Sequence, residues 1–492
     1  MNRRLRKYLI YGGGALLLAL AGTAAAVRLI DVDRYRPGIE AAIHEATGLD
    51  CSLGKLSLSL WPFLYLQSDH PVLRHAGQPI LQAERITASA HLLPLLSRRL
   101  EIHAITVTQL TGTIQRDRKG NLNLLPPWKP RPKQPITLPL ASLRVAKLVF
   151  RNANLRYEDA ASGTIAAAKD LNFTVGPFLL VDQGRTVVRS GRDLLAASWN
   201  GDLQATTISF NALTLDHPAL RFAVAQNTLT AKPVTAALYG GKMEGNVTVA
   251  DLGPNPQLAT ACSINDLDLT RLSVALHRKS RLIGRLHVTA TLTTSGMKHE
   301  VMLRRLNGTV AMQGKRLTLE NLDLDTALTQ YAKSQDIGLF ELGSIFIVGP
   351  FGPLLSKAFD LSGTALGMSR GNSRITQLAS DWTIRDGIAT TKDVAFATPH
   401  HRLAFRGQLD LPAERFRDFR VGVLDQRGCA TFTQTINGSF HAPQVEKTSF
   451  FARTIVNPLL SLFHKGATAL GGDGKTGCTP FYQGRVPHPA TP

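Results

Sequence analysis

Apolar and polar residues alternate along most of this chain with the two-residue period that is typical of β-strands. The alternation is clear in three early runs, Leu56–Leu60, Ile86–Leu92 and Leu100–Ala104. Later runs are separated by Gly, Asn or Asp, which are typical of turns. These later runs are Leu171–Val175, Ile208–Ala212, Leu220–Val224, Leu286–Leu292, Leu403–Leu411 and Phe419–Val423. The pattern predicts a mainly β protein.

The N-terminal end has a different pattern. An uncharged apolar stretch, Leu9–Val27, follows the basic run Arg3–Lys7. It is close to the ~20 residues that a membrane-spanning helix needs. Basic residues before a first helix favour the cytoplasmic side, so we expect a single-pass anchor with the rest of the chain across the membrane. The alternative is a cleaved secretory signal ending near Ala24–Ala26, and it exports the same body.

Few segments interrupt the strand pattern. A helix is predicted at Asp33–Ala46, with Pro37 in its first turn and Gly48 closing its end. Another is predicted near Ser449–His464. The patterns divide the chain into a basic end and anchor (1–30), a helix with strands (31–124), a Pro-rich linker (125–139), a β body (140–330), a helical interruption (331–375), C-terminal strands (376–445), and a C-terminal helix with a tail (446–492).

The predicted helices are too few to cover the apolar side of so many strands. Two arrangements solve this problem, and the pattern does not choose between them. The strands can form two packed sheets, or one long curled sheet whose apolar face lines an open groove. In the second arrangement the candidate lining residues are Phe173, Val175, Phe210, Phe222, Leu286, Val288 and Phe405.

The charge of the chain is strongly positive. Lys and Arg number 56 against 36 Asp and Glu, a formal net charge of +20. For an exported body this excess favours anionic membrane surfaces or lipid headgroups over nucleic acid. A solvated basic surface that keeps the protein soluble also accounts for most of it.

The four cysteines fit no metal-binding spacing. Cys429 and Cys478 both lie in turn-like surroundings of the last quarter of the chain, so they are the candidates for a disulfide in an oxidising compartment. Such a bond would tie the tail to the body. Cys51 and Cys262 are interpreted as small, partly buried residues.

No catalytic or cofactor-binding motif is convincing. The partial phosphate-loop ending Gly474–Thr476 lacks its first glycine, because that position is Ala469. The neighbouring histidines at 400 and 401, and at 70 and 75, lack the spacing and third ligand of a zinc site. We therefore predict a non-enzymatic protein without cofactor or metal, built to bind or to bridge.

An ordered series of short motifs resembles the AsmA family. It comprises Asp33–Pro37, Ala46–Gly48, Leu56–Leu60, Pro94–Ile102, Asp117–Asn121, Leu238–Gly241, Leu306–Thr309, Asp386–Gly387, Gly428–Cys429, Pro443–Lys447, and Cys478 ahead of Phe481–Gly484. The Pro-rich linker and the basic charge depart from the family pattern.

The resemblance implies a protein anchored in the bacterial inner membrane, with its body in the periplasm. The family is similar to bridge-like lipid-transfer proteins, so the implied fold is one N-terminal transmembrane helix, then a long curled antiparallel sheet that forms a groove, with a few short helices. The implied ligand is phospholipid and the implied role is outer-membrane lipid homeostasis. The alternative is a non-enzymatic factor that assists the outer-membrane protein assembly machinery. The family brings no catalytic residues.

Overall fold

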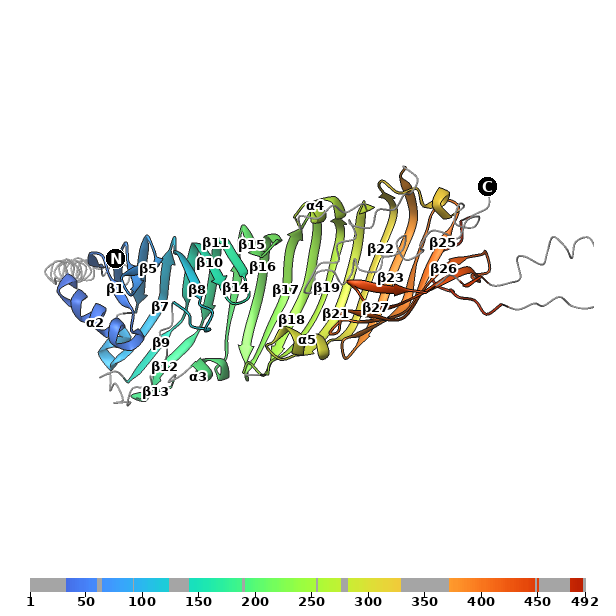
Figure 1. The fold of residues 1–492 in the computed structure, drawn as a ribbon. Coiled ribbons are helices and arrows are strands. Elements are labelled where there is room, and N and C mark those ends of the chain that lie inside the picture. The colour runs from blue at the N-terminus through green and yellow to red at the C-terminus, as the bar shows by residue number, and fades with distance from the viewer. Residues whose placement is uncertain are drawn as a thin grey trace, which may run out of the picture. The chain divides into compact units, whose positions relative to one another are not determined.

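The computed structural model describes residues 32–59, 64–91, 93–123, 141–187, 191–253, 255–275, 282–328, 371–446, 449–450 and 478–489. The chain forms two compact units, Met1–Ala236 and Ala237–Pro492. Both units are mainly β, with a few short helices, as Figure 1 shows. Their boundary falls within the segment 140–330 that the sequence pattern groups as one β body.

The helix predicted near the start of the body is present. A 3₁₀ turn, η1 (Val32–Tyr35), leads into α2 (Arg36–Thr47). Pro37 lies in the first turn, where its missing N–H removes no helical hydrogen bond. Gly48 ends the helix in the left-handed conformation at φ 75°, and its N–H donates to the carbonyl oxygen of His44 at 2.7 Å.

The first unit is a sheet with the 3₁₀ turn η2 (Leu93–Ser97) and helix α3 (Gly191–Ala196). Its strands are β1 (Asp50–Ser52), β2 (Leu56–Ser59), β3 (Leu64–Asp69), β4 (Val72–His75), β5 (Gln78–Gln82), β6 (Arg85–Ala90), β7 (Arg99–Thr108), β8 (Thr111–Arg116), β9 (Ser142–Val145), β10 (Leu148–Asp159), β11 (Thr164–Gly176), β12 (Phe178–Asp182), β13 (Arg185–Thr186), β14 (Trp199–Gln204), β15 (Thr207–Phe210) and β16 (Leu213–Ala225). Strand β17 (Thr228–Leu238) crosses the boundary between the units.

The pairing in this unit corrects one expectation. Most neighbouring strands are antiparallel, as predicted, but β7 pairs in parallel with β9 and β10, and β8 pairs in parallel with β10. The sheet is therefore mixed. The parallel pairs join β7 and β8 to β9 and β10, which follow the predicted linker in the sequence.

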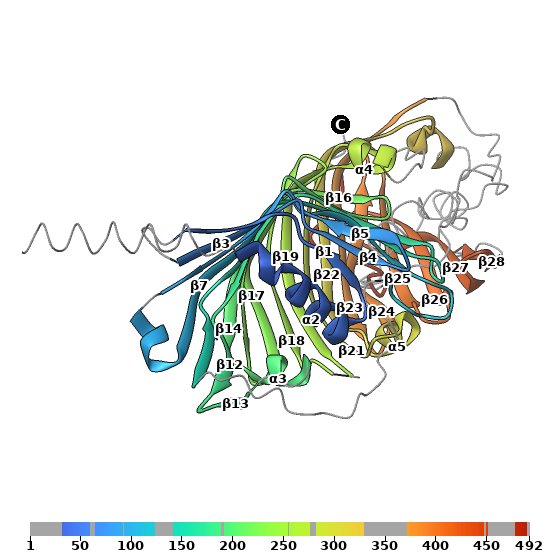
Figure 2. The same ribbon diagram turned by 90° about the vertical axis from the view of Figure 1, so that its left-hand side faces the viewer.

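A line of backbone kinks crosses the first unit, and we call it the crease. Residues at five strand positions across the unit take left-handed φ angles between 48° and 53°: His70, Gln109, Asn152, Asp170 and His217. The kinks separate β3 from β4 and β7 from β8, and they bend β10, β11 and β16 internally. In Figure 2, β3 and β7 run to one side of the resulting crest, and β4 and β5 run to the other.

Two asparagine side chains complete the hydrogen bonding at the crease. The N–H of Asn152 donates to Oδ1 of Asn172 at 3.2 Å, and the N–H of Asp170 donates to Oδ1 of Asn154 at 3.1 Å. These two N–H groups have left the regular ladder, and the asparagine side chains supply the acceptors that a neighbouring strand would otherwise provide. The bend is therefore a satisfied feature of the sheet.

The second unit is a sheet in which every described pairing is antiparallel. Two short helices, α4 (Leu269–Ala275) and α5 (His299–Arg304), lie at its rims. Its strands are β18 (Gly241–Ala250), β19 (Gln257–Asp268), β20 (Leu282–Ile283), β21 (Arg285–Ser295), β22 (Asn307–Leu319), β23 (Ser373–Arg385), β24 (Ile388–Ala397), β25 (Arg402–Asp410), β26 (Arg415–Leu424), β27 (Ala430–Ser439), β28 (Ala442–Val445) and β29 (Ser449–Phe450).

Several predicted segments lie outside the described residues. These are the anchor Leu9–Val27, the linker 125–139 and most of the interruption 331–375. Among the described helices, none is both long enough and apolar enough to span a bilayer. The helix predicted at Ser449–His464 is wrong at its start, because Ser449–Phe450 pairs with β27 as a strand; residues 451–464 are not described.

Candidate functional site

One face of the first unit carries two apolar rows that run across eight neighbouring strands. Each residue of a row is the register partner of the next, so the side chains lie on the same face. The first row is Leu58, Leu66, Ala88, Ile105, Leu148, Val175, Gly201 and Phe222. The second is Leu56, Ser68, Ile86, Val107, Phe150, Phe173, Leu203 and Leu220. We call this side the apolar face.

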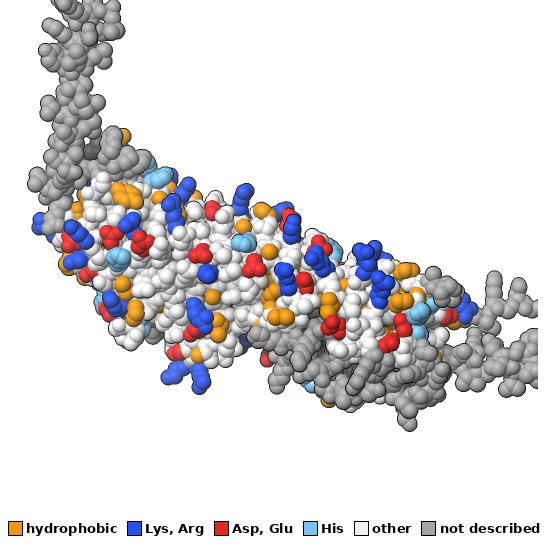
Figure 3. Space-filling model, turned by 90° about the horizontal axis from the view of Figure 1, so that it is seen from above, with side chains coloured by type: hydrophobic (Ala, Val, Ile, Leu, Met, Phe, Trp, Pro, Cys, Tyr) orange, Lys and Arg blue, Asp and Glu red, His pale blue; other side chains and the backbone are white. Residues whose placement is uncertain are grey.

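The opposite side of the same strands is polar. The register row between the two apolar rows consists of Ser57, Gln67, Thr87, Thr106, Val149, Thr174, Asp202 and Arg221. The face seen in Figure 3 is also mixed and largely polar, with Lys and Arg interspersed with Asp and Glu and only small separate groups of hydrophobic side chains. Alternation along each strand thus becomes a division between two faces of the sheet.

Aromatic rings gather at one end of the apolar face. Phe173 stacks on Phe222 with ring centroids 5.7 Å apart, and Phe150 lies 6.1 Å from Phe173. Trp199 meets Phe222 edge-on at 5.8 Å and lies 5.8 Å from Phe178. The rings of Phe150, Phe173, Phe222 and Trp199 are only half-buried. They therefore offer apolar area that this unit does not itself cover.

The apolar face continues beyond the crease, but there the alternation of apolar and polar residues along each strand is shifted by one residue. On β11 the spacing from Ala168 to Leu171 is three residues, and Asp170 forms the kink between them. The next row beyond the crease is Cys51, Leu73, Leu81, Gly112, Leu155, Ala168, Ile208 and Leu215. Phe210 lies here, paired with Ala166 and Leu213, and its side chain is 55% exposed.

The other predicted lining residues lie at different depths. In the first unit, Phe173 and Phe222 belong to the ring cluster, and Val175 lies in the same row as Phe222 and is buried at 5% exposure. In the second unit Val288 is half-buried, whereas Leu286 is buried. Phe405 belongs to a closed core and is 2% exposed. The structure thus brings together Phe173, Val175 and Phe222, and places the other four elsewhere. Contact of any of them with lipid stays a prediction.

The outer face of the second unit holds the end of the chain. Residues 478–489, which we call the C-terminal segment, lie against β23 to β26. Cys478 is joined to Cys429 in a disulfide, with Cα atoms 6.2 Å apart. Tyr482 and Val486 are buried on a floor of small side chains, which includes Ala379, Ala395 and Ala404. Because these residues are register partners on the outward side, they leave room for the segment.

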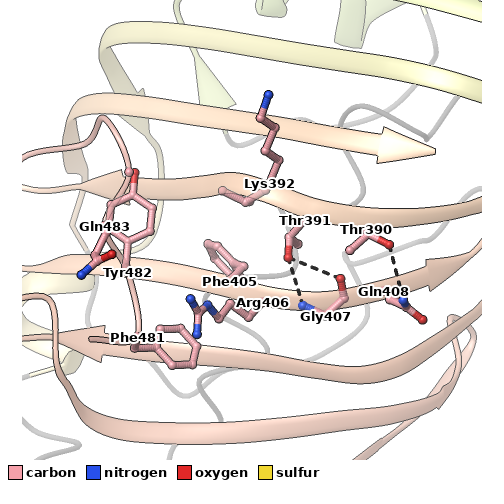
Figure 4. Close-up of a pocket in the computed structure, with 12 residues that line it drawn as sticks. Thr390, Thr391, Lys392, Phe405, Arg406, Gly407, Gln408, Phe481, Tyr482 and Gln483 are labelled. Atoms are coloured by element: carbon pink, nitrogen blue, oxygen red, sulfur yellow. Dashed lines mark hydrogen bonds between the residues drawn. The ribbon is translucent and has the colours of Figure 1, made fainter. Parts of the chain in front are cut away.

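Two arginine side chains of β25, Arg402 and Arg406, contact the C-terminal segment. Arg402 donates from Nη1 to the carbonyl oxygen of Val486 at 3.2 Å, and its guanidinium lies 5.6 Å from the ring centroid of Tyr482. Arg406 lies 5.5 Å from the ring centroid of Phe481. A cavity of about 500 Å³ opens between Phe481, Lys392 and Arg406, as Figure 4 shows.

Two carboxylates hold the segment most directly. Asp381 and Asp393 are register partners on β23 and β24, and Arg485 forms ion pairs with both, at 2.9 Å to Asp393. The hydroxyl of Tyr482 donates to Oδ1 of Asp393 at 2.5 Å. Like charges directly opposite each other in a sheet are destabilising. Arg485 therefore neutralises a pair that the strands alone would leave in repulsion.

The two carboxylates titrate in opposite directions. Burial raises the pKa of Asp381, and the attraction of Arg485 only partly opposes it. Burial would also raise the pKa of Asp393, but hydrogen bonds from Tyr482 and Arg485 outweigh it and hold this pKa below its usual value. Burial, followed by the hydrogen bond to Asp393, raises the pKa of Tyr482, so its hydroxyl stays protonated and remains a donor.

We expect Asp393→Asn to lower the free energy of unfolding of the second unit by ~1–3 kcal/mol, because it removes a charged acceptor from three donors, the hydroxyl of Tyr482 and the backbone N–H and Nε of Arg485. Asp381→Asn, the matched change one strand away, should cost less, since its ionised form is already disfavoured. Thermal unfolding at neutral pH measures both. Equal losses in the two variants would contradict the assignment of Asp393 as the main acceptor.

The pH dependence of these variants separates the two roles further. A carboxylate whose pKa is lowered by folding, such as Asp393, stabilises the protein above pH ~4, and this contribution is lost on acidification. A carboxylate whose pKa is raised by folding, such as Asp381, gives a contribution that is lost as the pH rises. From pH ~3 to ~6, the stability of Asp393→Asn relative to the unaltered protein should therefore fall. That of Asp381→Asn should rise. Parallel trends in a melting series over this range would refute the opposite shifts.

Sequence reasoning missed Trp199, Phe150 and the carboxylate pair. Trp199 had a usable signal, because it alternates with Gly201 and Leu203 in the apolar phase. Asp381 and Asp393 had none, since only the register of β23 and β24 brings them together. In the part of the chain that is described, no group of His, Cys, Asp and Glu could hold a metal ion.

One of three comparisons with known proteins finds a match. The model of the AsmA family matches residues 1–181 and 181–378. No curated protein matches the chain, and no solved structure does. The family match covers more than half of the chain, and it includes all the strands of the apolar face in the first unit. The chain belongs to the AsmA family, as the ordered motifs from Asp33 onward predicted.

Proposed function

We propose that this protein binds the acyl chains of phospholipids on the apolar face and supports phospholipid transfer for outer-membrane homeostasis. The observation that carries the proposal is the pair of rows across eight strands of the first unit, apolar at every position except Ser68 and Gly201, with most of their side chains only half-buried. A large apolar surface left exposed in a soluble domain marks a binding site or an aggregation hazard.

The dimensions of these rows suit an acyl chain. Seven steps between neighbouring strands, at ~4.8 Å each, give a row of ~34 Å. That length is comparable to the ~30 Å hydrocarbon core of a bilayer, which holds two acyl chains end to end. Each methylene group buried there contributes about 0.8 kcal/mol. The row is therefore long enough to shelter an extended chain while the polar headgroup stays in water.

The location that we propose is the periplasm, with the chain anchored in the inner membrane by Leu9–Val27. Support comes from the pairing of Cys429 with Cys478, because disulfides persist in oxidising compartments. Membership of the AsmA family also supports it. The excess of Lys and Arg would favour an anionic membrane surface nearby.

Mass spectrometry of lipid bound to residues 31–492, purified without detergent, tests the function. We expect near-stoichiometric phospholipid, and we expect Phe222→Asp to lose it because the charge would enter the centre of the ring cluster. Ala223→Asp is the matched control, since it places the same charge one residue along, on the exposed polar side.

Lipid retained by Ala223→Asp and lost by Phe222→Asp would support the proposal. A folded, lipid-free parent would refute it and redirect the search to protein partners, such as the outer-membrane assembly machinery. Circular dichroism of each variant shows whether the sheet has formed before lipid content is compared.

A further inference from the structure

We infer that within the second unit acyl chains contact only its first strands, and that strands β22 to β27 form a closed end from which lipid is excluded. This inference rests on the proposed function and adds where the lipid-binding surface stops. The stretch open to lipid is the apolar side of β18 and of β19 from Leu258 to Ile264, with β21 as the transition; Leu267, at the far end of β19, is buried against Leu286. The closed end is the hydrophobic core centred on β22 to β27, which also includes Leu282 and Leu286.

Along two rows of register partners in the second unit, the side chains change from half-buried to buried. One row runs from Met243 through Ile264 and Val288, all half-buried, to Met312 at 7%, Ser380 at 0% and Val394 at 2% exposure. The neighbouring row runs from Gly245 through Cys262 and Ala290 to Val310 at 7% and Trp382 at 1%. Both rows pass from open to buried between β21 and β22.

The rings at the closed end show how it is filled. Trp382 on β23 stacks on Phe419 on β26 with centroids 6.2 Å apart and planes at 11°. In a flat sheet these strands would be three steps, or ~14 Å, apart. The sheet therefore curls until its apolar side packs against itself. Phe405, Phe416 and Phe440 complete the filling, with centroid distances of 4.8–6.3 Å between neighbouring rings.

The curled strands are also held from outside. The C-terminal segment covers the opposite face of β23 to β26, through Tyr482, Val486 and the Arg485 ion pairs. Opening the core to lipid would move strands that are packed on both faces. Well-packed cores resist added methylenes, because each insertion displaces side chains from their rotamers. An acyl chain on β18 and β19 therefore has to leave the sheet before β22.

Quenching of tryptophan fluorescence by brominated acyl chains tests this limit, because bromine quenches only on contact. The full chain is reconstituted in vesicles of phosphatidylglycerol with dibromostearoyl chains, with Trp61 and Trp128 replaced by Phe throughout. Three versions each keep one tryptophan of interest: the native Trp199, the native Trp382, or an Ile264→Trp substitution on β19. Ser263→Trp is the matched control, because its side chain lies on the opposite face of the same strand.

We expect loss of emission for Trp199 and for Ile264→Trp, and unchanged emission for Trp382 and Ser263→Trp, relative to vesicles without bromine. Quenching of Trp382 alongside the open positions would overturn the closed end while leaving lipid binding intact. Unchanged emission for Ile264→Trp with Trp199 quenched would overturn the open stretch in the second unit. No quenching at any position would refute the proposed function itself. If Ile264→Trp does not fold, Leu258→Trp on the same strand and face replaces it.

Discussion

Replacing Cys429 and Cys478 together by serine should lower the free energy of unfolding of the second unit by about 4 kcal/mol. The bond closes a loop with a sequence separation of 49 residues, and a crosslink of that length removes substantial entropy from the unfolded chain. It also holds the start of the C-terminal segment beside Gly428, whose carbonyl oxygen accepts from the N–H of Phe481 at 2.8 Å. Loss of the bond should therefore release the segment first.

Denaturant unfolding of the oxidised protein and of the double variant measures this difference. Cys51→Ser is the matched control and should change stability little, since Cys51 has no disulfide partner. Intact mass before and after reduction and alkylation counts the bonds independently. Free thiols at both positions in periplasmic material would show that the bond does not form. Equal stability of the two proteins would show that it does not stabilise the second unit.

Trp382→Ala should destabilise the second unit by ~3–5 kcal/mol, the usual cost of truncating a buried aromatic side chain. Trp382 is 1% exposed, stacks on Phe419, and donates from its indole N–H to the hydroxyl of Ser380 at 2.8 Å. Its removal would leave a cavity at the centre of the closed end. The core around it packs from several strands, so the cavity cannot collapse without moving the sheet.

Trp199→Ala is the informative comparison, because Trp199 is half-buried at the ring cluster of the first unit. We expect it to cost less in the free energy of unfolding and more in bound lipid than Trp382→Ala. Calorimetry and lipid mass spectrometry on the same two preparations give both quantities. A large stability loss from Trp199→Ala with lipid retained would mean that its face is a structural core.

The alternation of residues predicts which side of a strand is apolar, and here it does so well. Phe173, Val175 and Phe222 share one face of neighbouring strands, as their phase requires. The same alternation contains no information about depth. Phe210 and Phe405 look equivalent in the sequence, yet one is 55% exposed and the other 2%. Depth depends on what a sheet curls against, and that is a tertiary property.

The parallel strand pairs could not be predicted from the sequence either, because they too depend on tertiary structure. A hairpin turn in the sequence predicts that the two strands beside it are antiparallel. The parallel pairs of β7 and β8 with β10 instead join strands that the predicted Pro-rich linker separates in the sequence. No local signal specifies that pairing. The Asp381–Asp393 pair has the same origin, because its geometry is set by the register of β23 on β24.

The crease has a consequence for which changes of length this protein can tolerate. It absorbs one extra residue on each strand that it crosses, so that Ala168 and Leu171 share a face despite their odd spacing. A single-residue deletion at Asp170 would remove that allowance, and every side chain on one arm of β11 would turn over. Substitution by Asn or Gly, which accept the same backbone angles, should be nearly harmless there. Variation among descendants of this sequence is therefore expected as substitutions at the crease and as gains or losses at strand ends, while the count of residues across it stays constant.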